Sequence, residues 1–149
     1  MSKKNIFLFL LLIVLGGIYL VYFTSFFQKP SVRISARPRV ERSHRSGKET
    51  ASVSFSFDQK LSISELKVVA LSDFETNKYP HALWNLVSDT NSIPLKGFAY
   101  GEFIKGMKPK VAKVRPEPLQ PQTKYRLLVD AGKIQGQVDF ELPNLRTEH

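Results

Sequence analysis

The sequence predicts an all-β protein, a seven-stranded antiparallel sandwich preceded by one N-terminal transmembrane helix. Three observations support this fold class. Residues 6–27 form an uninterrupted apolar segment without a charged residue. After it, apolar and polar residues alternate in seven short segments, and none of the intervening segments has the period of an amphipathic helix. Roughly 110 to 120 residues follow the apolar segment, which is enough for one domain and too few for two.

The predicted domain organisation follows from these segments. We expect residues 1–5 to be a short cytoplasmic tail, residues 6–27 the transmembrane helix and residues 28–31 a linker. The sandwich takes residues 32–142. The polar residues 143–149 are expected to be a flexible tail, as the ends of domains often are.

The apolar segment has the length of a membrane anchor. A helix over residues 6–27 extends about 33 Å, enough to cross the hydrocarbon core. Tyr19 and Tyr22 lie late in the segment, where aromatic rings favour the membrane interface. A cleaved signal peptide is the alternative, but it requires a shorter apolar region and a cleavage site of small residues. Phenylalanines at positions 23, 26 and 27 stand where small residues would be needed, so the pattern favours the anchor.

Charges on the two sides of the apolar segment indicate opposite orientations. Lys3 and Lys4 precede it, as in a protein whose N-terminus stays in the cytoplasm. The C-terminal flank is more basic, and the positive-inside rule would keep that flank inside. Folded domains translocate largely regardless of charge, which favours the first arrangement. We therefore expect a single-pass protein of the bacterial inner membrane, with its N-terminus inside and its C-terminal domain periplasmic or extracellular.

The net charge of +9 is concentrated beside the apolar segment. Residues 29–48 contain seven basic residues and one acidic residue, whereas residues 49–149 contain 13 basic and 12 acidic residues. A nucleic-acid-binding domain would need the basic residues on its folded face, so this distribution argues against that function. Basic residues beside a membrane segment favour contact with anionic lipid. The candidate lipid- or polyanion-contacting residues of this flank are Lys29, Arg33, Arg37 and Arg39.

Alternation of period two predicts each strand in turn. In the clearest strand, Val53, Phe55 and Phe57 alternate with serines. Residues 72–80 are expected to be a polar connection, and residues 105–121, which contain four prolines, an extended surface loop. The predicted strands cover residues 32–37, 52–57, 66–71, 82–86, 95–100, 125–129 and 138–142.

One motif resembles a known family. The pattern Leu-x-Pro-x-Thr-x-Tyr-x-Leu-x-Val over residues 119–129 resembles the start of the sixth strand in fibronectin type III and related immunoglobulin-like domains. In those domains the tyrosine packs its ring in the core and bonds its hydroxyl to nearby backbone, an arrangement called the tyrosine corner. The resemblance implies that Tyr125 is this structural residue, that Leu119 packs under the corner and that Pro121 stiffens the turn.

The sequence departs from that family at two places. Gln122 stands where the family usually has a glycine. The family typically places a tryptophan in its second strand, whereas here Trp84, the sole tryptophan, lies in the fourth predicted strand as a structural residue. The resemblance therefore implies an immunoglobulin/fibronectin-III-like sandwich, a fold that hosts many unrelated functions.

No arrangement of residues predicts catalysis, a cofactor or a metal site. The absence of cysteine excludes disulfides, Cys-ligated zinc and iron–sulfur clusters. The histidines, His44, His81 and His149, do not have the spacing of metal ligands. Asp139 and Glu141 alternate with apolar residues, as on an ordinary solvated strand face. We therefore expect a protein that is not an enzyme and binds neither cofactor nor metal.

Two segments have the composition of binding surfaces. Aromatic and methionine side chains are enriched at protein–protein interfaces. The candidate partner-binding residues are Phe98, Tyr100, Phe103, Ile104 and Met107, with the alternative that some of them fill one end of the core. A basic loop follows, which suits anionic lipid, a polyanionic envelope polymer or an acidic partner. Its candidates are Lys105, Lys108 and Lys110, with a merely solvated loop as the alternative.

Together these features predict a membrane-anchored, non-catalytic β-sandwich module for protein–protein interaction or scaffolding in the cell envelope. Its expected partners are the membrane and another envelope protein, without nucleic acid or metal. The alternative is an accessory subunit of a larger membrane enzyme, secretion or transport complex, in which the transmembrane helix makes the key contacts. Replacing the helix would distinguish the two hypotheses, because only the second requires that particular helix sequence.

Overall fold

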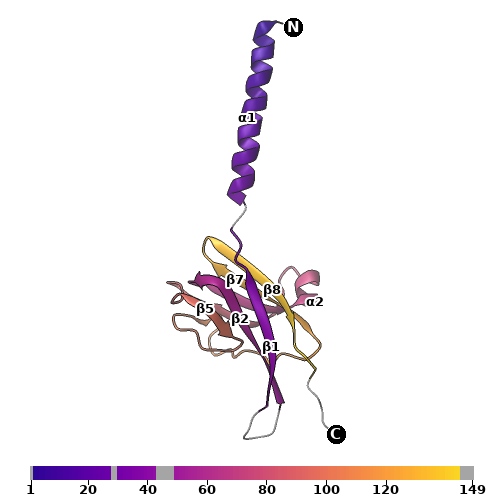
Figure 1. Ribbon diagram of the computed structural model, residues 1–149, viewed down its shortest axis with the longest axis vertical. Coiled ribbons are helices and arrows are strands. Elements are labelled where there is room, and N and C mark those ends of the chain that lie inside the picture. Colours follow the sequence, from indigo (N-terminus) through magenta and orange to yellow (C-terminus); the bar gives the residue numbers. More distant parts are fainter. Residues whose placement is uncertain (1, 28–29, 43–48, 145–149) are drawn as a thin grey trace. The chain divides into compact units, whose positions relative to one another are not determined.

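The computed structural model describes residues 2–27, 30–42 and 49–144. Its contacts divide the chain after Pro30 into two compact units (Figure 1). The first unit holds one long helix, and the second holds all the described strands and a short helix.

The N-terminal unit contains α1 (Lys3–Phe27), which begins within the predicted tail and continues through the apolar segment. Every side chain described from Lys3 to Thr24 is exposed. By length and composition the helix can cross a membrane. The Thr24 hydroxyl donates to the Leu20 carbonyl at 2.5 Å, so the helix itself satisfies this polar group within the apolar segment.

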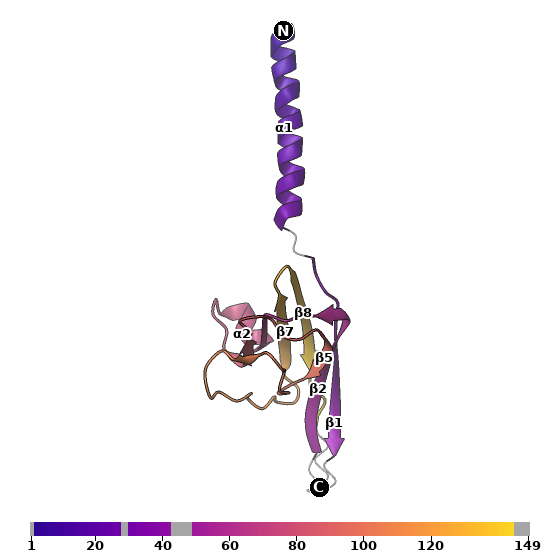
Figure 2. The same ribbon diagram turned by 90° about the vertical axis from the view of Figure 1, so that its left-hand side faces the viewer.

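The β-domain is a sandwich of two antiparallel sheets, as the alternating pattern predicts (Figure 2). One sheet has three strands in the order β1-β2-β5, and the other has five in the order β6-β4-β3-β7-β8. The strands of the first are β1 (Ile34–Arg42), β2 (Glu49–Leu61) and β5 (Leu95–Ala99). Those of the second are β3 (Glu65–Ala70), β4 (Ala82–Val87), β6 (Lys108–Pro109), β7 (Lys124–Ala131) and β8 (Ile134–Glu141).

Aromatic side chains from both sheets meet between the two layers. Phe55 of β2 is 2% exposed, and its ring centroid lies 5.1 Å from that of Phe140 in β8. The ring of Phe98 in β5 lies 5.3 Å from Phe55 and 5.8 Å from Trp84 in β4. Burying such a ring contributes about 1.5–3 kcal/mol, so these contacts hold the sheets together. The inward positions of the clearest predicted strand are all buried: Val53, Phe55 and Phe57.

A short helix, α2 (Leu71–Thr76), replaces part of the polar connection expected after the third strand. Its first residue had been predicted as the end of that strand. The Arg126 guanidinium of β7 lies 4.8 Å from the centre of the Phe74 ring, and the Asp73 carboxylate accepts a hydrogen bond from the His81 backbone at 2.5 Å. A helix of six residues is too short to show a sequence period, so these contacts decide its position.

The described part of the domain has eight strands rather than the seven predicted. The additional strand, β6, lies in the proline-containing segment that was expected to be a loop. It pairs with the edge of β4, where Pro109 stands opposite Leu86 and Lys108 opposite Val87. A pair of residues carries no alternation, so the sequence pattern could not indicate this strand.

The turn before β7 is closed by a hydrogen bond to the Tyr125 hydroxyl. The Gln120 backbone N–H donates to the Tyr125 hydroxyl at 2.8 Å, and the Tyr125 ring is buried. Leu119 packs, partly buried, against the core, and Pro121 begins the turn. Gln122 has a φ of 59°, in the left-handed region that favours glycine. The conformation explains why glycine would suit this position.

Candidate functional site

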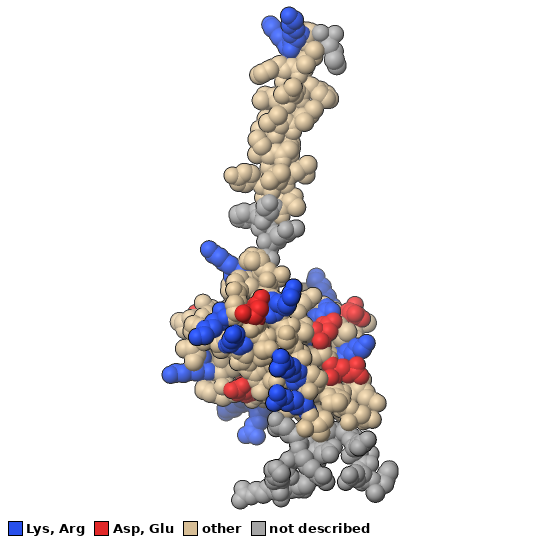
Figure 3. Space-filling model, viewed as in Figure 1, with Lys and Arg blue, Asp and Glu red and all other residues tan. Residues whose placement is uncertain are grey.

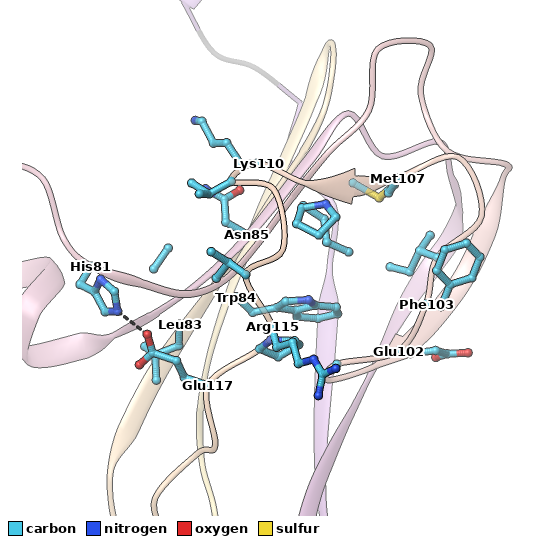
Figure 4. Close-up of a pocket in the computed structure, with 18 residues that line it drawn as sticks. His81, Leu83, Trp84, Asn85, Glu102, Phe103, Met107, Lys110, Arg115 and Glu117 are labelled. Atoms are coloured by element: carbon cyan, nitrogen blue, oxygen red, sulfur yellow. Dashed lines mark hydrogen bonds and ion pairs between the residues drawn. The ribbon is translucent and has the colours of Figure 1, made fainter.

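A cleft of about 460 Å³ lies beside the edge of β4. The chain leaves β5 at Ala99, passes through residues 100–117 and returns along β4. It bonds to β4 at two places outside β6: the Lys110 N–H donates to Asn85 at 3.1 Å, and the Glu117 N–H donates to Leu83 at 2.9 Å. Residues 111–116 lie between these attachments, and with residues 101–110 and β4 they enclose the cleft (Figure 4).

The cleft has a buried apolar floor and an exposed apolar rim. Its floor consists of the core residues Trp84, Leu86, Ile104 and Met107. Its rim carries Phe103, 84% exposed, with Val111 at 63% and Val114 at 52%. Single exposed apolar residues are ordinary on a protein surface, but three around one cleft form a site where a partner could bury apolar area.

Polar groups lie at the margins of the cleft. His81 Nε2 and Glu117 Oε1 are 2.7 Å apart at one end, and Phe103 lies at the other, with Trp84 and Arg115 between them (Figure 4). Asn85 also lines the cleft, and its side-chain oxygen is buried without a hydrogen-bond partner. Within the described chain, the cleft therefore offers a mostly apolar surface with a few groups able to orient a ligand.

Tyr100 fixes the segment that leaves β5. Its hydroxyl donates to the Glu117 backbone carbonyl at 2.7 Å, and its ring lies 5.1 Å from Trp84. Burial chiefly, and the negative charge of Glu117 in addition, raise the pKa of Tyr100 above its ordinary value. The hydroxyl therefore remains a donor at physiological pH and holds the two ends of the loop together.

The five candidate partner-binding residues have different positions. Phe98 is buried in the aromatic core, and Tyr100 is partly buried between Trp84 and Glu117. Phe103 is exposed at the rim of the cleft, and the last two candidates, Ile104 and Met107, lie in its floor. Three of the five thus line one cleft. Val111 and Val114 were not among the predicted residues; their only signal was two isolated valines in a basic, proline-rich loop.

The candidate lipid- or polyanion-contacting residues fall into two separate groups. Arg33, Arg37 and Arg39 lie on or just before β1, an edge of the three-stranded sheet. The lysines of the other group lie on and around β6, at the edge of the five-stranded sheet: Lys105, Lys108 and Lys110. Lys108 pairs with Asp89 at 2.6 Å and Lys110 with Glu65 at 3.2 Å. Lys29 lies outside the described residues.

The described residues contain no group of three or more histidine and acidic side chains that could hold a metal ion. His44 and His149 lie outside those residues, and the His81 imidazole pairs with Glu117 while its backbone N–H donates to Asp73. Asp139 and Glu141 are exposed on β8, with Asp139 bound to Arg126 of β7 at 2.6 Å. The cleft therefore offers mainly apolar surface, and of its polar groups His81 and Glu117 are paired with each other.

Comparison with known proteins gives no relative: no family model, curated protein or solved structure matches the chain.

Proposed function

We propose that the protein is a membrane-anchored, non-catalytic interaction module, in which α1 is the anchor and the cleft beside β4 binds another envelope protein. The observation that carries this proposal is the exposed apolar rim over a preformed apolar floor. Protein interfaces concentrate their binding energy in aromatic and apolar side chains that enter such pockets and lose contact with water. Phe103 and the two valines provide that surface without any rearrangement of the core.

We further propose that the domain is immunoglobulin/fibronectin-III-like. Three features support this: the tyrosine-corner hydrogen bond at Tyr125, the left-handed conformation at Gln122 and the division of the strands between two antiparallel sheets. Such domains serve adhesion, scaffolding and enzyme-accessory roles, so the proposed function rests on the cleft and not on the fold.

We propose that α1 places the protein in the bacterial inner membrane, with the N-terminus inside and the domain in the periplasm or outside the cell. The length, the composition and the exposed apolar surface of α1 support the anchor. A C-terminal tag tests the orientation in protease-treated spheroplasts. Digestion of the tag in intact spheroplasts is expected, and protection until lysis would place the domain in the cytoplasm.

A photo-crosslinking amino acid tests partner binding. It replaces Phe103 in one strain and Tyr79 in a control strain, because both side chains are 84% exposed and only Phe103 lines the cleft. We expect a discrete crosslinked product from position 103 in living cells and none from position 79. Adding Val114→Asp to the first strain should abolish the product. Equal labelling from both positions, or a product that resists Val114→Asp, would refute the cleft as the interface.

An accessory-subunit role makes a different prediction about α1, whose apolar side chains are exposed all around the helix. Such a role requires contacts from the helix sequence itself. Replacing α1 with an unrelated single-pass helix should preserve the crosslink at position 103 if α1 is only an anchor. Loss of the crosslink with unchanged membrane insertion would favour the accessory-subunit role.

A further inference from the structure

A row of arginines and a row of serines lie side by side on the outer face of the three-stranded sheet. In the pairing of β1 with β2, Arg37 stands opposite Ser54 and Arg39 opposite Ser52. Because successive side chains of a strand alternate in direction, the buried positions between these serines place the serines themselves outward. The arginine–serine face is defined by Arg33, Ser35, Arg37, Arg39, Ser52, Ser54 and Ser56.

The third strand of the sheet adds only small side chains beside these serines. Gly97 and Ala99 of β5 stand opposite Ser56 and Ser54, and neither has a side chain larger than a methyl group. A Cβ added at Gly97 would lie 2.4 Å from the Phe55 carbonyl oxygen, so the close approach of the two strands excludes larger residues there. The face therefore presents guanidinium and hydroxyl donors without bulky apolar side chains to screen them.

The arginines of the face have no acidic partner within the described chain. None of the ion pairs described involves Arg33, Arg37 or Arg39, although Asp58 of β2 stands beside Arg33 and donates its backbone N–H to the Arg33 carbonyl at 3.3 Å. Arg126 of the other sheet, in contrast, binds Asp139 with two nitrogens at 2.6 and 2.9 Å. Basic side chains outnumber acidic ones on the side of the domain seen in Figure 3. Arg37 and Arg39 are thus exposed donors that form no ion pair among the described residues.

The covalent chain limits how far this face can lie from the proposed anchor. Arg33 follows the end of α1 at Phe27 by six residues, which span at most about 21 Å when fully extended. Arg37 and Arg39 are the second and third outward residues after Arg33 on the same face, so they lie roughly 14 and 20 Å farther along the strand. Head groups extend roughly 5–7 Å beyond each side of the hydrocarbon core, and charges interact across about 8 Å at physiological ionic strength.

We propose that the arginine–serine face binds the anionic phospholipid head groups of the membrane that holds α1. Guanidinium groups bind phosphate oxygens with two parallel N–H donors, and serine hydroxyls supply further donors to the same oxygens. Arginines spaced along one strand match an array of phosphates better than they match a single small anion. The proposal rests on the anchoring role of α1 and uses a surface separate from the cleft.

The test uses the full chain in lipid nanodiscs. Because the sequence has no cysteine, Ser35→Cys gives one fluorophore on the face, and Gln137→Cys gives a matched exposed label on β8 in the other sheet. One kind of disc consists of neutral phosphatidylcholine, and the other contains one third anionic phosphatidylglycerol. Both contain a lipid with a quencher on its head group. We expect quenching at position 35 to be at least twofold stronger in the anionic discs and to fall with added salt, without a change at position 137.

Charge variants identify the groups responsible. Arg37→Gln with Arg39→Gln should remove the dependence on phosphatidylglycerol at position 35, whereas the corresponding double lysine variant should retain most of it. Lys124→Gln, an exposed charge on β7, should have no effect. Circular dichroism of each variant reports whether the domain remains folded.

The outcomes separate the two proposals. If the protein does not co-elute with either disc, the anchor proposal fails. If it co-elutes but quenching at position 35 is the same in both lipids, the head-group proposal alone is overturned. If heparin shifts the label at position 35 while quenching is the same in both lipids, the face binds a soluble polyanion and not the head groups.

Discussion

The arginine–serine face and the cleft beside β4 are built in opposite ways. The face consists of outward residues on two strands paired over nine residue pairs, and its side chains contribute little to the core. The cleft is made by a long loop attached to β4 at a few backbone bonds, and core residues form its floor. Outward side chains of the face can therefore be substituted with little loss of stability. Substitutions in the floor of the cleft change binding and stability together, because the floor consists of core residues.

Trp84 and Phe103 provide the sharpest test of this coupling, because both line the cleft but only Trp84 is buried, at 4% exposure. Trp84→Ala should lower the free energy of unfolding by about 3–5 kcal/mol, because it removes a large ring from the core. Phe103→Ala should change it by less than about 0.5 kcal/mol. Urea unfolding in detergent micelles, followed by circular dichroism, measures both. Similar losses would show that the rim is part of the core.

Gly97 limits how far the face tolerates change. Gly97→Ala should lower the free energy of unfolding by about 1–3 kcal/mol, because the new Cβ meets the Phe55 carbonyl oxygen and the strands must separate. Ser54→Ala, on the adjacent strand of the same face, should cost less than about 0.5 kcal/mol. Urea midpoints of the two variants check the contrast. A tolerated Gly97→Ala would mean that β5 can shift without loss.

Tyr125 anchors the end of the loop that forms the cleft. Tyr125→Phe leaves the partly buried Gln120 N–H without its acceptor and should cost about 1–1.5 kcal/mol. Tyr79→Phe removes a hydroxyl from a side chain that is 84% exposed and should cost nothing measurable. Thermal unfolding of both variants compares them. Equal midpoints would show that this hydrogen bond does not stabilise the corner.

Gln122 offers a stabilising change in the same turn. Gln122→Gly should raise the free energy of unfolding by about 0.5–1 kcal/mol, because glycine adopts a φ of 59° without the steric cost of a Cβ. Gln137→Gly, in the middle of β8, should instead lower it by about 0.5–1 kcal/mol. Chemical unfolding of the two variants shows whether each change raises or lowers the free energy of unfolding. A loss in both would mean that the Gln122 side chain makes a stabilising contact.

The ion pair between Arg126 and Asp139 should have the smallest effect on the free energy of unfolding, and that effect should depend on pH. The hydrogen bonds from Arg126 chiefly, and the charge of Arg126 in addition, lower the pKa of Asp139 below the ordinary value of 3.8. A lowered folded-state pKa means that the pair stabilises the fold above that ordinary value and ceases to do so as the pH falls through the lower one. Asp139 is half exposed, so solvent reduces the effect, and Asp139→Asn should cost about 0.5 kcal/mol or less at pH 7.

Urea midpoints at pH 7 and at successively lower pH measure this difference, which should shrink as the pH falls through the lowered pKa of Asp139. Glu141→Gln on the same strand is the control, because within the described residues Glu141 forms no ion pair. A difference that persists in acid would point to packing of the Asp139 side chain and not to its charge.

Much of the fold follows from local patterns. The apolar segment gives α1, and period two gives the strands that contain Phe55, Leu127 and Phe140, because a strand with one buried face must alternate. Tyr125 was identified from its motif, and the hydrogen bond with Gln120 is present. The short helix α2 and the two-residue strand β6 could not be predicted, because neither is long enough to show a period.

The candidate site was only partly accessible to the same reasoning. Composition singled out Phe103, Ile104 and Met107, but it could not separate them from Phe98, which lies in the core. The valines at positions 111 and 114 face the same cleft because the loop closes back on β4 through the Glu117 N–H. That closure joins residues far apart in the sequence, and no local pattern records it.

The sequence by itself determined the apolar helix, the two-layer β-domain and the outward arginines and serines, since each depends only on the period of neighbouring residues. Only the tertiary structure decided that Phe98 lies in the core whereas Phe103 lies at the rim of the cleft. It also decided that the arginines of β1 and the lysines around β6 lie on different sheets. The physical reason is that burial and charge pairing depend on which distant strands come together, and the free energy of the whole core selects that pairing.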